Sequence, residues 1–215
     1  MSPGSRRPCR KRIPMRDWEL TDREILYEGF FRLARYHLRH ERFDGAWSPV
    51  LQREIFERGH AAAVLPYDPD TDRIALIEQF RPGALEAASG PWLLEFVAGI
   101  IEAGETPEDV VRREAVEEAD CTIGRLEWIC RYHVSPGGST ETTALFIGQA
   151  SLDGVGGVHG NADEHEDIQV HIVDATEAIA MADDGRISNA MGLIGLNWFA
   201  RHHERLRSEW RARPD

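Results

Sequence analysis

Three glutamates, at positions 114, 117 and 118, are the residues of this sequence whose types and spacing best suit chemistry. On a helix, residues three and four positions apart are neighbours, so these carboxylates would share one face. Like charges placed in this way repel one another, whereas a divalent cation bound between them makes their proximity favourable. Ligands that are all oxygen suit Mg²⁺ or Mn²⁺. Taken alone, the pattern is more typical of a solvated acidic helix face, so the surrounding residues decide.

The residues before the glutamates predict the elements that would hold them. Thr106 can cap a helix, Pro107 fits the first helical position, and Asp109 stands three residues after the cap. Further upstream, residues 92–97 are typical of a strand, and Gly99 lies in the turn that follows. We therefore expect a strand, a glycine-bearing loop and an acidic helix, in that order.

This spacing resembles the Nudix box, the signature motif of the Nudix hydrolases. The positions in register with it are Gly99, Glu105, Arg113, Glu114, Ala115, Glu117 and Glu118. Two positions depart from it, because Asp120 stands where the family has Gly, and Cys121 where it has an aliphatic residue. The Gly closes the helix with a positive φ angle, which Asp tolerates. We therefore expect a modest cost in stability and no effect on metal binding.

Composition places the chain among globular proteins. Its 215 residues, 42% of them hydrophobic, suffice for one domain with a small appended element. No apolar run approaches the roughly 20 residues of a membrane span. The formal charge of −12 argues against a nucleic-acid binder, and it means that metal ions and local arginines must attract any phosphorylated substrate. Three widely spaced cysteines without a metal-type pattern are typical of reduced thiols in the cytoplasm.

Three segments are expected along the chain. Residues 1–17 are basic, contain Pro and Gly, and lack the apolar core of a signal peptide, which predicts a disordered tail. Residues 18–58 mix aromatic and aliphatic residues with charges, which predicts a small N-terminal β-rich element. Residues 59–210 hold the other strands and helices in an α+β order. Within them, residues 151–167 carry four Gly and no apolar periodicity, which indicates a functional or disordered loop.

The resemblance extends beyond the box, from about residue 18 to residue 203, and it points to the bacterial ADP-ribose pyrophosphatases within the family. The runs that carry it are residues 53–61, residues 135–138 with Glu141, and residues 158–168. It implies an α/β/α sandwich around a mixed sheet. It also implies Mg²⁺-dependent hydrolysis of ADP-ribose to AMP and ribose 5-phosphate, with Mn²⁺ as a possible substitute. The family further implies a homodimer whose N-terminal strands complete the substrate site.

The resemblance assigns a role to each group of residues. The cation would be held by the backbone carbonyl of Ala98 and by the carboxylates of Glu114, Glu118 and Glu166. Glu164 would be the general base on the 151–167 loop, and Glu117 would reach a metal ion through water. Glu105 and Arg113 would form a structural ion pair. Residues that would bind the substrate are Phe30, Phe31, Arg53, Arg58, Arg81, Ser135 and Glu141.

Two other functions remain open at this point. One is hydrolysis of another nucleoside diphosphate sugar, such as GDP-mannose, because recognition of a sugar cannot be derived from one sequence. The other is a binding module that senses ADP-ribose without cleaving it. Such modules usually lose carboxylates of the box and gain a DNA-binding domain, whereas Glu114, Glu117 and Glu118 are all present here. The sequence therefore favours an enzyme.

Overall fold

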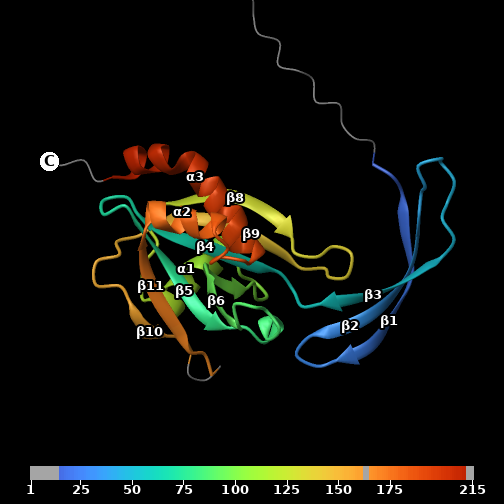
Figure 1. Cartoon of the computed structure of the whole chain (residues 1–215). Helices are drawn as coiled ribbons and strands as arrows, with labels where there is room; N and C mark the ends of the chain where they lie inside the picture. The colour runs from blue at the N-terminus through green and yellow to red at the C-terminus, as the bar shows by residue number, and fades with distance from the viewer. Residues whose placement is uncertain (1–14, 162–164, 212–215) are drawn as a thin grey trace, which may run out of the picture. The chain divides into compact units, whose positions relative to one another are not determined.

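The computed structural model describes residues 15–161 and 165–211, and the chain divides into two compact units, one ending at Glu57 and one beginning at Arg58. The N-terminal unit is an antiparallel sheet of three strands in the order β1 (Trp18–Glu28), β2 (Arg32–His40) and β3 (Leu51–Glu57) (Figure 1). Ala34 and Ser48 are the only buried residues in its described part. The predicted N-terminal β-rich element is therefore present, and it has almost no core of its own.

The second unit is built on a mixed sheet of eight strands. The main order is β10-β11-β5-β4-β9-β8, while β6 pairs with β5 and β7 with β4. The strands are β4 (Ala61–Asp68), β5 (Arg73–Phe80), β6 (Trp92–Glu95), β7 (Val97–Ile100), β8 (Leu126–His133), β9 (Thr142–Gln149), β10 (Gly157–His159) and β11 (Ile168–Asp174). The pair β4–β9 is parallel, and the other pairs are antiparallel.

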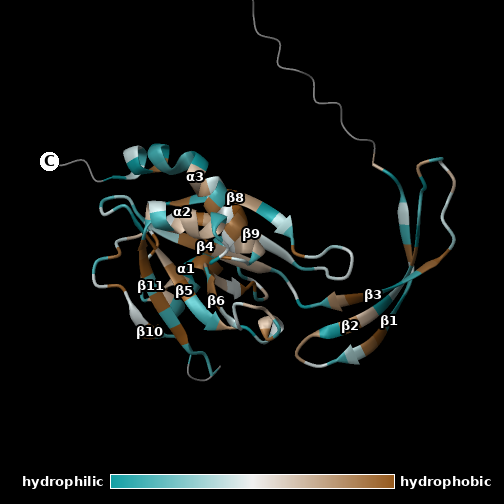
Figure 2. Ribbon diagram, in the orientation of Figure 1, coloured by the Kyte–Doolittle hydropathy of each residue, from teal (hydrophilic) through white to brown (hydrophobic). Residues whose placement is uncertain are grey.

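Helices cover both faces of this sheet. Alternate residues of a strand point to opposite faces. In β4, Val64 therefore joins the buried cluster that contains α1 (Pro107–Ala119), and Leu65 joins the cluster on α2 (Ala175–Asp183) and α3 (Ala190–Trp210). Figure 2 shows hydrophobic residues along β11 and hydrophilic residues near the C-terminal end of α3. The predicted α/β/α sandwich is confirmed, and no helix in the described ranges is long and apolar enough to cross a membrane.

The signals at both ends of α1 act as expected. The Thr106 hydroxyl accepts a hydrogen bond from the backbone N–H of Asp109 at 3.2 Å, and the Asp109 carboxylate accepts one from the backbone N–H of Thr106 at 3.0 Å. Together these bonds form a capping box, which satisfies two N–H groups at the start of the helix. At the other end, Asp120 is left-handed, with φ 46° and ψ 38°. Asp120 thus takes the positive φ expected where the family has Gly.

Two predicted elements differ from the structure. The expected single strand over 92–97 is wrong, because β6 ends at Glu95 and β7 begins at Val97, each paired with a different strand. Phe96, between them, is fully buried beside α3, where a Cβ on Gly195 would lie 2.2 Å from its ring. The 151–167 loop contains the short strand β10.

Candidate active site

Glu118 is a carboxylate buried inside the sandwich. It lies in the last turn of α1 with 2% of its surface exposed, and its Oε2 accepts a hydrogen bond from the backbone N–H of Ala98 in β7 at 3.0 Å. Burial raises the pKa of Glu118 to about 8, and the negative charges of Glu114 and Glu166 act in the same direction. A buried carboxylate without a cationic partner is costly. A cation bound beside Glu118 would therefore stabilise its ionised carboxylate.

Glu114 lies one turn earlier on the same helix face, against the strand that carries Gly99. A Cβ added to Gly99 would lie 1.7 Å from Glu114 Oε1, so the carboxylate occupies the space that a side chain at 99 would need. Burial raises the pKa of Glu114, and the ion pair with Arg113, at 2.7 Å, opposes that shift. The Gly of the box is thus required here for close packing rather than for an unusual φ angle.

Arg113 connects the loop before α1 to the carboxylates of the helix. Its guanidinium forms a two-point ion pair with Glu105, at 3.0 Å from Nε to Oε1 and 3.2 Å from Nη2 to Oε2. The same group donates to Glu114, and it reaches Glu117 Oε2 at 3.4 Å. Glu117 is the exposed member of the three, with 45% of its side chain accessible. One arginine thereby offsets part of the repulsion between the glutamates of α1.

Glu166 enters the site from a different part of the chain, just before β11. Its Oε2 accepts a hydrogen bond from the backbone N–H of Asn161 at 3.1 Å. Its negative charge contributes to raising the pKa of both Glu114 and Glu118. Three of the four predicted metal ligands thus influence one another electrostatically, and Ala98 lies in hydrogen-bond contact with one of them.

The donors in this cluster suit a hard divalent cation. In residues 15–161 and 165–211, no three His, Cys, Asp or Glu side chains form a ready-made group of metal ligands. Each of the three carboxylates is instead held by a protein donor: Arg113 for Glu114, Ala98 for Glu118 and Asn161 for Glu166. The set consists of oxygen atoms only, and its charges are partly buried and mutually repulsive. Oxygen-only donors of this type are those that a hard divalent cation prefers.

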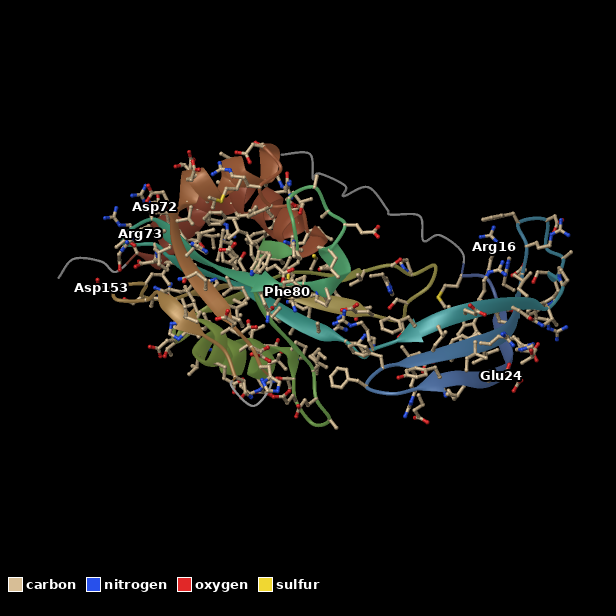
Figure 3. The ribbon with its side chains drawn as sticks, turned by 60° about the horizontal axis from the view of Figure 1, so that its bottom comes forward. Arg16, Glu24, Asp72, Arg73, Phe80 and Asp153 are labelled. Atoms are coloured by element: carbon tan, nitrogen blue, oxygen red, sulfur yellow. The ribbon has the colours of Figure 1, made fainter. Side chains whose placement is uncertain are left out.

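An arginine lies at the edge of the same face. Phe80 ends β5 (Figure 3), and Arg81 follows it, donating from Nε and Nη2 to Glu95 Oε2 at 2.9 and 2.6 Å. Glu95 is buried with 7% of its surface exposed, and the Arg81 charge acts to lower the pKa of Glu118. Sequence reasoning missed Glu95, although a lone acidic residue in the apolar run 92–97 is a usable signal. Arg81 is thereby held in a fixed orientation near the carboxylates.

The connection between β8 and β9 brings together a second group of predicted residues. Glu141 is buried, with 8% of its surface exposed, and its carboxylate pairs with Arg58 at 3.5 Å. Ser135 is exposed, and its backbone carbonyl accepts bonds from the backbone N–H groups of Gly138 and Ser139. Beside them, Thr142 donates its backbone N–H to His60 Nδ1 at 3.2 Å, a contact that sequence reasoning also missed.

Three other predicted site residues belong to the N-terminal unit, and a fourth lies outside the described residues. Phe30, Phe31 and Arg53 belong to the N-terminal unit, where Phe30 is 88% exposed and its ring meets that of Phe31 edge to face. Arg53 is exposed and donates to the backbone carbonyl of Gln52 at 2.7 Å. Glu164, the predicted general base, lies outside the described residues. The roles of these four residues remain predictions.

Comparisons with known proteins agree with this architecture. A solved structure described as an ADP compounds hydrolase superposes with a TM-score of 0.67 over 93% of this chain and 100% of that chain, at 17% identity, which shows a shared fold. The ADP-ribose pyrophosphatase of Escherichia coli (strain K12) is 47% identical over 90% of this chain and 93% of its own. That of Haemophilus influenzae is 41% identical, with 91% of each chain covered. A GDP-mannose pyrophosphatase of Pectobacterium atrosepticum is 30% identical over 85% of this chain and 97% of its own.

The family assignment rests on sequence and structure together. A model of the NUDIX domain matches residues 57–191, a range that contains α1 with its glutamates, Arg81 with Glu95, and Glu166. The relatives named above cover nearly the whole chain rather than the box alone. This chain belongs to the Nudix domain family.

Proposed function

We propose that this protein is a divalent-metal-dependent pyrophosphatase that hydrolyses ADP-ribose to AMP and ribose 5-phosphate. The observation that carries the proposal is the 47% identity, over 90% of the chain, to a relative named ADP-ribose pyrophosphatase. The relatives named GDP-mannose pyrophosphatase are less similar, at 30% and 33% identity. Glu114, Glu117 and Glu118 are all present, which favours cleavage over sensing without cleavage.

The cation site of the proposal consists of Glu114, Glu118, Glu166 and the backbone carbonyl of Ala98. A bound Mg²⁺ or Mn²⁺ would neutralise the oxygens of the pyrophosphate, which otherwise repel an attacking water. The 2.7 Å contact with Arg113 favours the ionised form of Glu114 and opposes the burial that raises its pKa, and burial keeps bulk water away from Glu118. Glu164 takes the proton of the attacking water. Glu117, at the exposed edge of the helix, would reach a metal ion through water.

Substrate binding is assigned to two groups of residues. Arg81, oriented by Glu95, presents a planar fork of donors that suits a phosphate. The terminal ribose would be bound through its hydroxyl groups. Glu141, which pairs with Arg58, would accept hydrogen bonds from them, and Arg58 and Ser135 would donate hydrogen bonds to them. Phe30 and Phe31 would stack on adenine, and Arg53 would bind a phosphate or the ribose. We further propose a cytoplasmic location, in keeping with two free cysteines, Cys121 and Cys130, in the described residues.

A product assay with Mg²⁺ tests the function on four substrates: ADP-ribose, ADP-glucose, GDP-mannose and NADH. We expect ADP-ribose to give AMP and ribose 5-phosphate with the highest kcat/KM. If GDP-mannose gives the highest value, the alternative substrate is correct and the assignments of Arg53, Phe30 and Glu141 fail. If no compound is cleaved but ADP-ribose raises the melting temperature, the protein is a sensor. Asp120, which stands where the family has Gly, is then the first residue to replace by Gly.

We also propose that the protein is a homodimer assembled through the N-terminal unit. Its three-stranded sheet buries only Ala34 and Ser48 within the described residues, and it exposes many large apolar side chains. They include Trp18, Leu20, Ile25, Tyr27, Phe30, Phe43, Trp47, Val50 and Phe56. So much exposed apolar surface is unusual for a monomer and typical of an interface. Sedimentation at micromolar protein concentration should give the mass of a dimer, and a monomer mass would contradict the proposal.

A further inference from the structure

The turn that follows β10 is joined to α1 by a backbone contact. The N–H of Gly160 donates to the carbonyl of Glu117 at 3.3 Å, and the strands β10 and β11 pack near α1 (Figure 1). Gly160 has a φ of +115°, which lies in the region that L residues rarely adopt. The turn is thus attached to the helix that carries Glu114 and Glu118, at a residue whose backbone conformation requires Gly.

The same turn also fixes Glu166. Asn161 donates its backbone N–H to Glu166 Oε2 at 3.1 Å, and Glu166 donates its own backbone N–H to the carbonyl of Asn161 at 3.1 Å. A Cβ on Gly160 would lie 2.8 Å from Glu166 Cβ, 3.1 Å from its carbonyl oxygen and 3.2 Å from its carbonyl carbon. Because two of these atoms belong to the backbone, rotating the Glu166 side chain cannot relieve the clash.

These contacts form a continuous path from α1 through Gly160 and Asn161 to Glu166. We propose that Gly160 is a positioning residue that sets how closely Glu166 approaches Glu114 and Glu118, and thereby sets the affinity of the site for a divalent cation. The inference rests on the proposed metal site and adds a residue that binds no ligand itself. Residues that orient metal ligands typically change metal affinity by about 10- to 100-fold when they are altered.

The test compares Gly160→Ala with Gly157→Ala. Gly157 has a φ of +94°, so Ala is strained there too, but its Cβ would meet only His159 Nε2 at 3.8 Å. The two variants therefore share the backbone strain, and only Gly160→Ala displaces Glu166. Mn²⁺ is titrated by calorimetry into the metal-free full-length protein. We expect the dissociation constant to rise about 10- to 100-fold for Gly160→Ala and to stay near the wild-type value for Gly157→Ala.

A second pair of variants separates positioning of Glu166 from a general structural effect. In a Glu166→Gln background, adding Gly160→Ala should cause no further loss of Mn²⁺ affinity, because the ligand that it displaces is already altered. The inference would be overturned if Gly160→Ala and Gly157→Ala bound Mn²⁺ with equal affinity. It would also be overturned if Gly160→Ala caused the same further loss of affinity in the Glu166→Gln background, or if the wild type did not bind Mn²⁺. Because the readout is Mn²⁺ binding, the result does not depend on which substrate the wild-type enzyme hydrolyses.

Discussion

Glu118→Gln is expected to reduce kcat by about 10³-fold, because the several kcal/mol that a bound cation contributes would be lost. The substitution keeps the size of the side chain and its hydrogen bond from Ala98, so folding should be preserved. The matched control is Glu108→Gln, the same chemical change at an exposed position in the first turn of α1. Steady-state kinetics with saturating Mg²⁺ measure both variants. Near-normal turnover of Glu118→Gln would remove Glu118 from the metal site.

The same variant should change how stability depends on pH in the absence of metal. Burial raises the pKa of Glu118 to about 8, so between pH 4.5, the ordinary value, and pH 8 the folded state keeps a proton that the unfolded state releases. The contribution of Glu118 to the stability of the metal-free wild type therefore falls as pH rises through this window. In EDTA, Glu118→Gln should be the more stable protein at pH 8 and equal to the wild type below pH 4.5. Mg²⁺ should raise the melting temperature of the wild type and leave that of the variant unchanged.

Gly99→Ala is expected to lower activity by about 100-fold, the typical cost of displacing a functional group by about 1 Å. The new Cβ would lie 1.7 Å from Glu114 Oε1, 2.4 Å from Cδ and 2.7 Å from Cγ, so the carboxylate must leave its position. All three atoms belong to a flexible side chain, and Gly99 has no positive φ, so the melting temperature should change little. A loss of activity without a loss of stability is the expected signature.

Gly83→Ala provides the control for this prediction. Gly83 has open space where a Cβ would be placed and no positive φ angle, so Ala there should leave both activity and stability unchanged. Activity assays with increasing Mg²⁺ and thermal unfolding in EDTA measure the two variants side by side. If Gly99→Ala keeps wild-type turnover, Glu114 in its present position is not required for the reaction. If it unfolds, the contact at Gly99 is structural instead.

The elements around the box were predictable because their signals are local. Thr106, Pro107 and Asp109 fixed the start of α1 within one turn of sequence, and Asp120 took the backbone conformation expected of a helix-closing residue. The order of elements predicted only an α+β fold, and the sandwich followed from the resemblance to the Nudix hydrolases. At both ends of α1 the residues that decide the structure lie within a few positions of one another, so long-range information was not needed there.

The features that were missed depend on pairing between distant strands. The break at Phe96 arises because β6 pairs with β5 and β7 with β4, a change of partner that no local pattern contains. The contact between Arg81 and Glu95 requires β5 and β6 to be adjacent. β10 was missed because it is three residues long and begins with Gly157. The roles of Glu164 and of the residues in the N-terminal unit rest on resemblance alone.

The parallel pairing of β4 with β9 has a consequence for the order in which the molecule assembles. Ala61 pairs with Thr143, so β5 to β8 and the whole of α1 lie in the chain between two strands that must meet at the centre of the sheet. Pairings so distant in sequence form slowly, because the loop must close before the contacts stabilise it. Glu166 enters later still, with β11. A chain emerging during synthesis therefore has the signature helix long before it has Glu166, the proposed metal ligand that comes from outside that helix.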